Sequence, residues 1–233
     1  MTTHQVHLVT GAGSGIGAAV ATALHERGDE LVLLARSQPR AHELRQQYDG
    51  ARVVVADLAD PGHLEHALAD ANLPPRLDSV LHIAGVVDLS PVADLPYEQI
   101  RSQLDVNLVA PMVLTRACLP ALRAAHGLVL LVNSGAGLTA HAGWGAYAAS
   151  KFGLRAFADS LRAEEAAHGV RVTSVFPGRT ATPMQEKVHE QESADYEAGK
   201  WIQASTVAST ILHVLDLPRD AVVPEVSVRP GPR

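Results

Sequence analysis

The stretch Val6-His-Leu-Val-Thr-Gly-Ala-Gly-Ser-Gly-Ile-Gly17 decides the fold that we predict for this chain. Residues 6–10 form a short apolar run typical of a buried strand, and residues 18–27 are helix-forming and end at Gly28. A strand, a glycine-rich turn and a helix in this order cradle a phosphate group, because the helix N-terminus presents N–H donors and the positive end of a dipole. The stretch therefore predicts the first unit of a dinucleotide-binding fold.

Each glycine of this turn has its own expected role. Gly11 permits the tight turn, Gly15 lets a pyrophosphate approach closely, and Gly17 lets the helix pack against the strand. Ser14 and Ile16 lie between these glycines and are expected to share the contact with the cofactor. A glycine-rich turn alone is a weak signal, since plain turn chemistry uses the same residues, and the flanking strand and helix give it weight.

Strands and helices alternate along the rest of the chain. Further apolar runs that read as strands occupy residues 31–34, 53–56, 79–83, 128–132, 170–176 and 221–228. Helical patterns occupy residues 61–72 with Asp60 as N-cap, 97–123 with a kink expected at Pro111, the segment from Tyr147 to about His168, and 205–217 with Ser205 or Thr206 as cap. This spacing predicts an α/β fold of the Rossmann type: a doubly wound, mostly parallel seven-stranded sheet with helices on both faces. Pro224 within the last run suits an edge strand.

Composition limits the class of protein. No long polar linker divides the 233 residues, so one domain, 1–233, is expected, with the more polar segment at about 183–204 as a lid over the substrate. The net charge of −6 argues against a nucleic-acid partner, and no apolar run reaches the ~18 residues needed to span a membrane. The single Cys118 and the lack of a signal-peptide pattern favour a cytoplasmic protein. No metal site is expected.

The residues after the second strand indicate the cofactor. An NAD-binding unit usually places a carboxylate about 20 residues after the glycines, where it binds the ribose 2′-hydroxyl. No acidic residue occurs between Leu31 and His42, and Arg36 stands there instead. A guanidinium can stack on adenine and pair with a 2′-phosphate, which favours NADP(H) over NAD(H). A solvated surface arginine is the alternative. Further cofactor contacts are expected from Ser37 and from Asp57-Leu58, which close the third strand.

The stretch from Ser134 to Lys151 supplies the catalytic candidates. Tyr147 and Lys151 are four residues apart on a predicted helix, so their side chains share one face. Ser134 follows a strand, at the edge where open α/β sheets bind their ligands. A lysine charge about 5 Å from the phenol should lower the tyrosine pKa from about 10 by about 2 units. These three groups are suited to moving a proton to or from an oxygen.

Taken in order, the motifs resemble those of the short-chain dehydrogenase/reductase family over essentially the whole chain. They are Thr10-Gly-Ala-Gly-Ser-Gly-Ile-Gly17, Asp57, Ala84-Gly85, Asn107, Ser134, Tyr147-Ala-Ala-Ser-Lys151 and Pro177-Gly178. A second Tyr-x-x-x-Lys pattern, Tyr196–Lys200, contains a helix-weakening glycine and has no serine at the right interval, so we interpret it as coincidence.

The resemblance implies a role for each residue. Tyr147 would be the general acid in reduction and the base in oxidation, Lys151 would bind the nicotinamide ribose, and Ser134 would hydrogen-bond the substrate oxygen. Asn107 would hold a water that joins Lys151 to solvent; the alternative is that this buried amide only satisfies structural hydrogen bonds. The remaining cofactor contacts would come from Ala84, Gly85, Pro177, Gly178, Thr180 and Thr182. The substrate would be a small carbonyl compound or alcohol.

Some positions depart from the family pattern. His82 stands where the family commonly has an asparagine, and we expect it to tie strands together rather than to act in catalysis. The C-terminal Glu225–Pro230 resembles the branch of NADP-dependent 3-hydroxy-acid dehydrogenases and carbonyl reductases. His141 and Trp144 are expected in the wall of the substrate pocket, or else in packing or a subunit contact.

Three functions remain open on this basis: an NADPH-dependent carbonyl reductase, an NAD-dependent alcohol dehydrogenase, or a dinucleotide-binding regulator without activity. Members of the family are usually homotetramers, and a homodimer is the smaller alternative. The small residues Ala146, Ala149, Gly153 and Ala156 share a helix face that permits close pairing of subunits, although the core of a monomer could use this face equally.

Overall fold

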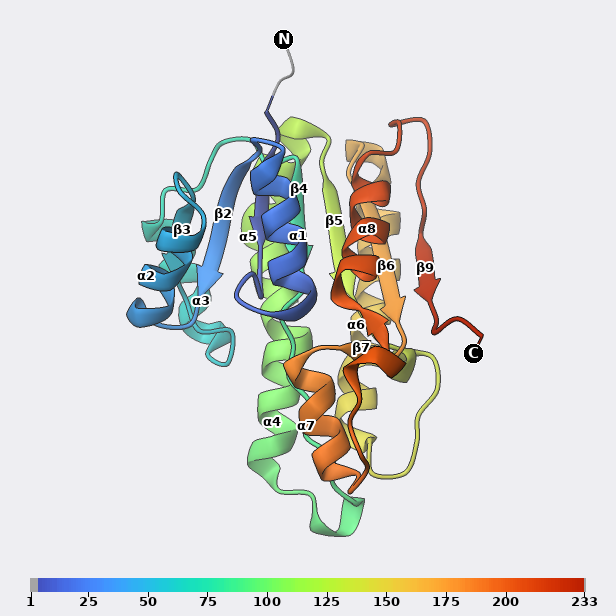
Figure 1. Cartoon of the computed structure of the whole chain (residues 1–233). Helices are drawn as coiled ribbons and strands as arrows, with labels where there is room; N and C mark the ends of the chain where they lie inside the picture. Colours follow the sequence, from blue (N-terminus) through green and yellow to red (C-terminus); the bar gives the residue numbers. More distant parts are fainter. Residues whose placement is uncertain (1–3, 233) are drawn as a thin grey trace.

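The computed structural model describes residues 4–232 and has a central parallel sheet with helices on both faces (Figure 1). In the described residues this sheet has seven strands in the order β3-β2-β1-β4-β5-β6-β9, and every pairing is parallel. Its strands are β1 (Val6–Val9), β2 (Glu30–Ala35), β3 (Arg52–Val55), β4 (Ser79–His82), β5 (Leu128–Val132), β6 (Arg171–Pro177) and β9 (Glu225–Val228). The predicted fold class is confirmed, and β9 lies at the edge, as Pro224 suggested.

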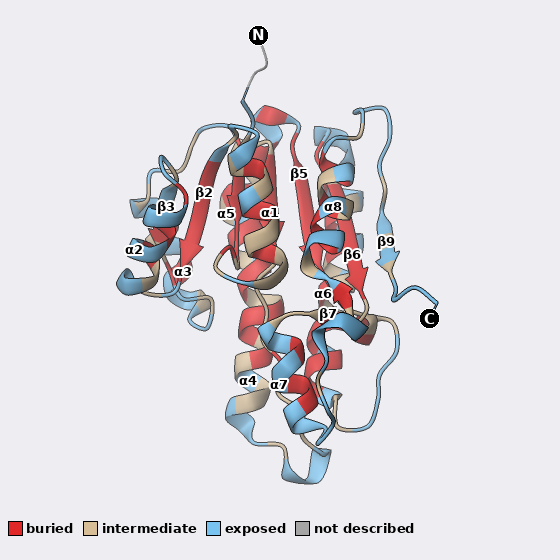
Figure 2. Cartoon of the chain, in the orientation of Figure 1, coloured by how far each residue is buried: buried red, intermediate tan, exposed pale blue. Residues whose placement is uncertain are grey.

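The helices divide between the two faces of the sheet. One face packs against α1 (Gly15–Glu26), α2 (Gln38–Gln47) and α8 (Ala204–Leu215), and the other against α3 (Pro61–Asp70), α5 (Ala110–Ala125) and α6 (Gly145–Glu165). Strand side chains alternate between these two layers: Leu33 belongs to the first core and Val32 to the second. The central strands are therefore buried from both sides (Figure 2).

The carboxyl ends of the strands all meet at one edge, where the remaining elements gather (Figure 1). These are α4 (Tyr97–Leu104), α7 (Pro183–Gln191), the short parallel pair β7 (Thr180–Ala181) and β8 (Ile202–Gln203), and the helical turns η1 (Val92–Asp94), η3 (Gly135–Gly137) and η5 (Ala198–Lys200). A further turn, η4 (Ala166–His168), extends α6 at the opposite edge. The segment proposed as a lid, 183–204, thus has secondary structure of its own.

The helix predicted over 97–123 is interrupted before Pro111 rather than kinked at it. A π-helical turn, η2 (Asp105–Val109), separates α4 from α5. Pro111 has no N–H to donate to the carbonyl of Asn107 four residues earlier, so the α-helical hydrogen bonding cannot continue across this point. The widened turn holds Asn107 in the interior, where it is 1% exposed.

The joined run Tyr97–Ala125 is, by length and composition, the one helical stretch among residues 4–232 that could cross a membrane. The side of it formed by Leu114, Cys118 and Leu122 is buried against the sheet. This arrangement is that of a core helix.

Three local readings differ from the structure. The last strand was predicted over 221–228, but β9 begins only at Glu225, so Pro224 precedes the strand rather than lying within it. The sequence reading passed over α2, although Ser37 accepts a hydrogen bond from the N–H of Arg40 and Pro39 stands in the first turn, which are helix-start signals. The cap of α8 was predicted at Ser205 or Thr206 and this is wrong, because the helix already begins at Ala204. Gln203 precedes it in extended backbone as the end of β8, so pairing with β7 sets the start.

Candidate active site

The glycine turn after β1 is packed so closely that side chains do not fit. A Cβ on Gly17 would lie 2.1 Å from the carbonyl oxygen of Gly11, and a Cβ on Gly11 would lie 2.9 Å from the backbone nitrogen of Ala84. Gly11 also has a φ of +76°, which L side chains rarely adopt. Ser14 is the N-cap of α1, and its side chain makes no capping hydrogen bond. The first N–H groups of α1 are therefore available to an anion.

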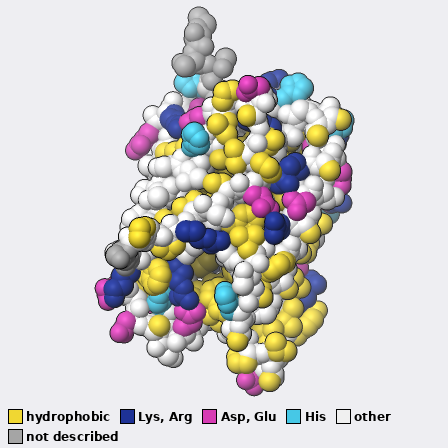
Figure 3. Space-filling view, turned by 90° about the vertical axis from the view of Figure 1, so that its right-hand side faces the viewer, with side chains coloured by type: hydrophobic (Ala, Val, Ile, Leu, Met, Phe, Trp, Pro, Cys, Tyr) yellow, Lys and Arg dark blue, Asp and Glu magenta, His cyan; other side chains and the backbone are white. Residues whose placement is uncertain are grey.

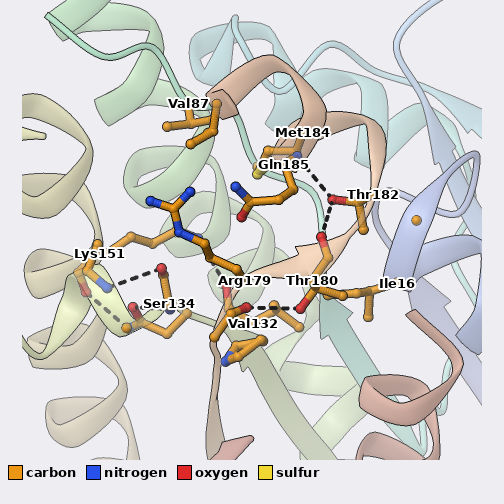
Figure 4. A pocket seen from close by; sticks show the side chains of 18 of the residues that line it. Ile16, Val87, Val132, Ser134, Lys151, Arg179, Thr180, Thr182, Met184 and Gln185 are labelled. Carbon is orange, nitrogen blue, oxygen red and sulfur yellow. Dashed lines mark hydrogen bonds between the residues drawn. The ribbon is translucent and has the colours of Figure 1, made fainter. Parts of the chain in front are cut away.

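A pocket of about 460 Å³ opens beyond this turn at the carboxyl edge of the sheet. Most predicted site residues line it: Gly11, Ser14, Gly15, Ile16, Gly17, Ala84, Gly85, Ser134, Tyr147, Lys151, Pro177, Gly178, Thr180 and Thr182, together with His141 and Trp144. In Figure 4, Ser134 and Lys151 lie on one side of the pocket, and Ile16 and Thr182 on the other. The structure thus brings the glycine turn and the proton-transfer candidates to one pocket.

Two of the three catalytic candidates are buried, and two are hydrogen-bonded to neighbouring backbone groups. Tyr147 is 6% and Lys151 4% exposed, one turn apart on α6. The Nζ atom of Lys151 donates to the carbonyl oxygen of Val132 at 3.0 Å and lies 5.8 Å from the centroid of the Tyr147 ring. Ser134 starts η3, accepts a hydrogen bond from the N–H of Ala136 at 3.1 Å, and lies close enough to Tyr147 for its hydroxyl to lower the pKa of the phenol. A hydroxyl and a phenol therefore lie near each other beside an ammonium group.

The electrostatics of this site differ from the prediction. Burial raises the pKa of Tyr147, and the hydrogen bond to Ser134 offsets part of the rise. Burial also lowers the pKa of Lys151 to about 8. The predicted net lowering of the Tyr147 pKa by Lys151 is therefore wrong, because removing both groups from water favours their neutral forms and this desolvation dominates. The Tyr147 phenol stays protonated at neutral pH.

Asn107 lies behind the pocket wall rather than in it. Its amide accepts from the N–H of Val86 and donates to the carbonyl of Val86, both at 2.9 Å, and also donates to Ser150 Oγ at 3.1 Å. A Cβ on Gly85 would lie 3.1 Å from Asn107 Oδ1 and 3.7 Å from Lys151 Nζ. The side chain of Asn107 therefore fixes the backbone that separates it from Lys151. These contacts correspond to the structural role that was the alternative to holding a water.

The predicted adenosine contacts lie outside the pocket. Arg36 is exposed just after β2, Ser37 caps α2, and Asp57 accepts a hydrogen bond from the N–H of Ala59 at 2.9 Å. Leu58 packs against the core. These residues follow the neighbouring strands β2 and β3, so they share the edge that holds the glycine turn but not its pocket.

A basic residue that the sequence reading missed lies directly at the glycine turn. Arg40, on α2, donates to the carbonyl oxygen of Gly13 and pairs with Glu43. No motif marked this residue, because the contact depends on how α2 packs beside the turn.

Other polar pocket residues were also missed, among them Asn133, Arg179 and Arg229, whereas Met184 and Gln185 come from the segment predicted as a lid. Asn133 donates to the carbonyl of Lys151 at 3.0 Å and accepts from the N–H of Ser134 at 2.8 Å, so it joins β5 to α6. A polar residue at the end of an apolar strand was the available signal. Arg179 and Arg229 carried no such signal, since their place depends on contacts between distant segments.

His82 has a structural role, as expected, but with a different partner. Its Nε2 lies 2.8 Å from Thr115 Oγ1, so it ties β4 to α5 rather than one strand to another. Burial lowers the pKa of His82 to about 3, which keeps the ring neutral. Within residues 4–232 no group of three or more His, Cys, Asp or Glu side chains is arranged to hold a metal ion.

Comparison with known proteins adds to this geometry. The sequence model of the family described as short chain dehydrogenase matches residues 5–193. An uncharacterized oxidoreductase of Staphylococcus epidermidis is 33% identical over 229 residues, 97% of each chain. The crystal structure of an alcohol dehydrogenase from the archaeon Thermococcus sibiricus, complexed with 5-hydroxy-NADP, superposes with a TM-score of 0.82 at 26% identity and covers 97% of this chain and 96% of that one. A 4-hydroxyisoleucine dehydrogenase complexed with NADH, at 23% identity, shares the fold with a TM-score of 0.85 and 98% coverage of both chains.

Proposed function

The chain belongs to the short-chain dehydrogenase/reductase family and is an oxidoreductase that acts on CH–OH groups with a nicotinamide dinucleotide. From this premise we propose that it is an NADP(H)-dependent reductase of ketones or aldehydes. The reverse reaction would oxidise the corresponding alcohol. The observation that carries the proposal is the meeting of Ser134, Tyr147 and Lys151 with the glycine turn in one pocket. No other described pocket combines such groups.

The residues present fit a dinucleotide. The N-terminus of α1, with an uncapped Ser14 and a turn too tight for side chains, suits a pyrophosphate. Lys151 and Thr182 flank the pocket and would hold the nicotinamide end. When bound, the nicotinamide supplies or accepts the hydride.

The chain's own residues would then manage the proton. Ser134 Oγ would hold the carbonyl oxygen, and Tyr147, which lies beside Ser134, would donate its proton to that oxygen. The raised pKa of Tyr147 keeps the phenol protonated at neutral pH, which suits the reductive direction. Lys151, with a pKa of about 8, is still charged at neutral pH and would stabilise the phenolate that remains. Asn107 would act as a positioning residue by fixing Gly85 and Val86 beside Lys151.

The cofactor preference rests on two arginines. No acidic residue lies between Leu31 and His42 to bind a 2′-hydroxyl, while Arg36 follows β2 and Arg40 lies on the glycine turn. We propose NADP(H) on this ground, with Ser37, Asp57 and Leu58 along the adenosine.

An NAD-dependent alcohol dehydrogenase is the second candidate. It is favoured by the pairing of Arg40 with Glu43, which neutralises part of the positive charge. The ratio of KM values for NADPH and NADH separates the two candidates. Arg36→Asp should reverse a preference for NADPH and leave a preference for NADH intact.

The remaining assignments are also proposals. Pro183, Met184, Gln185 and Val188 line the pocket from the segment 183–204, which supports a lid role. A cytoplasmic location is supported by the free, buried Cys118, whose thiol pKa burial raises to about 12. A homotetramer or homodimer is supported by the exposed apolar side chains of Met112 on α5 and Phe152 on α6.

The decisive experiment follows NADPH oxidation by the purified protein with a panel of ketones and aldehydes. Tyr147→Phe should lower kcat about 10³-fold or more, since it removes the general acid, while NADPH binding measured by fluorescence is retained. Undiminished turnover by Tyr147→Phe would remove the tyrosine from the mechanism.

A further inference from the structure

Arg229 lies at the substrate end of the pocket because of the register of the edge strand. Its neighbour Val228 pairs with Pro177 of β6 and accepts a hydrogen bond from the N–H of Gly178 at 2.8 Å. The chain therefore leaves β9 at the carboxyl edge of the sheet. A Cβ on Gly135 would lie 2.9 Å from Arg229 Nη1, so the guanidinium lies against the residue next to Ser134.

The charge of Arg229 has no counterpart in the pocket. In the described part of the chain, no Asp or Glu lines this pocket, and its cations are Lys151, Arg179 and Arg229. Arg179 is paired with Glu192 through two hydrogen bonds of 2.7 and 2.8 Å and covers the Trp201 ring, while Lys151 donates to Val132. Arg229 makes no hydrogen bond or ion pair with any described residue. Figure 3 shows basic side chains and a histidine around a hollow on the face that includes the β9 side of the molecule.

The position of Arg229 separates it from the expected phosphate groups. The pyrophosphate would lie at the N-terminus of α1, and the basic residue that touches the glycine turn is Arg40. Arg229 instead touches Gly135, in the turn that begins with the Ser134 hydroxyl. A group bound by Arg229 would therefore be part of the molecule whose oxygen Ser134 and Tyr147 hold.

We propose that Arg229 binds the carboxylate of the substrate, so that the enzyme acts on oxo acids and the corresponding hydroxy acids, and this proposal rests on the function proposed above. A guanidinium binds a carboxylate through two parallel hydrogen bonds, a geometry that an unpaired arginine at a pocket rim can adopt. Because Arg229 lies beside the neighbour of Ser134, the carboxylate and the carbonyl are separated by only a few atoms. Neutral analogues of the same size lack this contact.

The test uses the full chain with NADPH and a set of 2-oxo and 3-oxo acids, each paired with its methyl ester. The wild-type protein should prefer the acid of the best pair. Arg229→Gln should lower kcat/KM for that acid about 10- to 100-fold, mainly through KM, because it removes a charge-assisted hydrogen bond, and should leave the ester unchanged. Arg229→Lys should retain part of the preference. Arg219→Gln, at the opposite end of the sheet, is the matched control and should leave kcat/KM unchanged for both the acid and the ester.

Two results would overturn the proposal. Equal efficiency of the wild-type protein on acid and ester is one, and an equal loss on both substrates in Arg229→Gln, which indicates a packing role, is the other. If the wild-type protein turns over none of the carbonyl compounds, the result instead counts against the proposed function. In that case carboxylate binding, followed through quenching of Trp144 in the pocket wall, still decides: wild-type binding that Arg229→Gln loses supports the inference, and equal binding by both contradicts it.

Discussion

At the residue scale, the site buries an acidic phenol and a basic amine together, and burial disfavours the charged form of each. Burial favours the neutral phenol of Tyr147 and the neutral amine of Lys151. A neutral phenol suits a general acid in reduction, whereas a neutral lysine could not stabilise the phenolate that forms. The charge on Lys151 is kept at a cost in stability, because a pKa of about 8 still leaves it protonated at neutral pH.

This cost predicts how stability depends on pH. The folded-state pKa of Lys151, about 8, lies below its ordinary value of 10.5, so between these limits the folded protein binds fewer protons than the unfolded chain and gains stability as pH rises. Relative to Lys151→Met, the free energy of unfolding of the wild-type protein should increase by about 2 kcal/mol between pH 7 and about pH 9.5. Urea denaturation at the two pH values measures this difference.

The comparison with Lys151→Met cancels groups that titrate in both proteins and the pH-independent loss of the bond to Val132. Lys187→Met, which changes an exposed lysine paired with Asp88, serves as control and should show no such gain. A constant difference between the wild-type protein and Lys151→Met across this range would mean that Lys151 has an ordinary pKa.

Residue identities predicted most of the site because their signals are local. Gly11, Ser134, Tyr147 and Lys151 stand at fixed intervals from strand ends, and all line the pocket. Arg229 could not be placed in the same way. Its role depends on the register between β6 and β9, two strands that are far apart in sequence.

At the scale of single elements, the π-helical turn is the feature that the sequence indicated only in part. Pro111 signals an interruption, but the freed carbonyl lies four residues earlier, so the irregular segment precedes the proline. That segment carries Asn107, whose amide satisfies both backbone polar groups of Val86. The break in the helix therefore supports the wall of the pocket.

Removing this amide should destabilise the fold. Asn107→Ala leaves the part-buried N–H and carbonyl of Val86 without their side-chain partner, and we expect a loss of about 1–3 kcal/mol in the free energy of unfolding. Ser150→Ala removes a bond to Asn107 but leaves Val86 paired, so its loss should be smaller. Equal losses in these two variants, measured by urea denaturation, would show that Val86 does not depend on Asn107.

Two ion pairs, Arg179 with Glu192 and Lys187 with Asp88, tie the segment 183–204 to the rest of the described chain. Arg179, just before β7, binds Glu192 at the end of α7, and this pairing lowers the pKa of the Glu192 carboxyl. Glu192→Gln should therefore loosen the segment and raise KM for the carbonyl substrate with little change in kcat. Limited proteolysis should also cut this variant faster than wild type between α7 and β8.

Glu190→Gln is the matched control for this experiment. Glu190 lies on the same helix and is exposed, and its side chain makes no hydrogen bond or ion pair in the described structure. If both variants behave like the wild-type protein, the segment does not act as a lid.

At the scale of the whole molecule, the alternation of strands and helices was sufficient to predict the sheet, its parallel pairing and the two helical layers. It was not sufficient for α2, a mostly polar helix of which only Ala41 and Leu44 are buried, so its apolar periodicity is weak. The alternation of strands and helices also did not predict how the segment 183–204 is organised. Its contacts, such as His189 against Tyr196 and Trp201, join helix α7 to the irregular chain that follows it.

The helix face predicted for subunit pairing is only partly free. Ala146 is buried, and Gly153 packs against Leu108 of the π-helical turn, so these two small residues serve the chain's own core. Ala149 and Ala156 remain exposed on α6, with Phe152 between them at 43% exposure. Met112, at the start of α5, is exposed to the same extent.

An exposed phenylalanine between two alanines on a long helix costs hydration free energy unless a second subunit covers it. If α6 pairs with a second copy of the chain, Phe152→Glu places a charge in that contact, and the sedimentation coefficient should fall to the monomer value. Val222→Glu, which changes a similarly exposed apolar residue before β9, should leave the assembly intact. A wild-type protein that sediments as a monomer would contradict the assembly itself, whereas an oligomer that survives Phe152→Glu would move the interface to another face. Because Phe152 follows Lys151 directly, the same contact would also hold the helix that carries the catalytic candidates, and the monomeric variant should lose activity together with assembly.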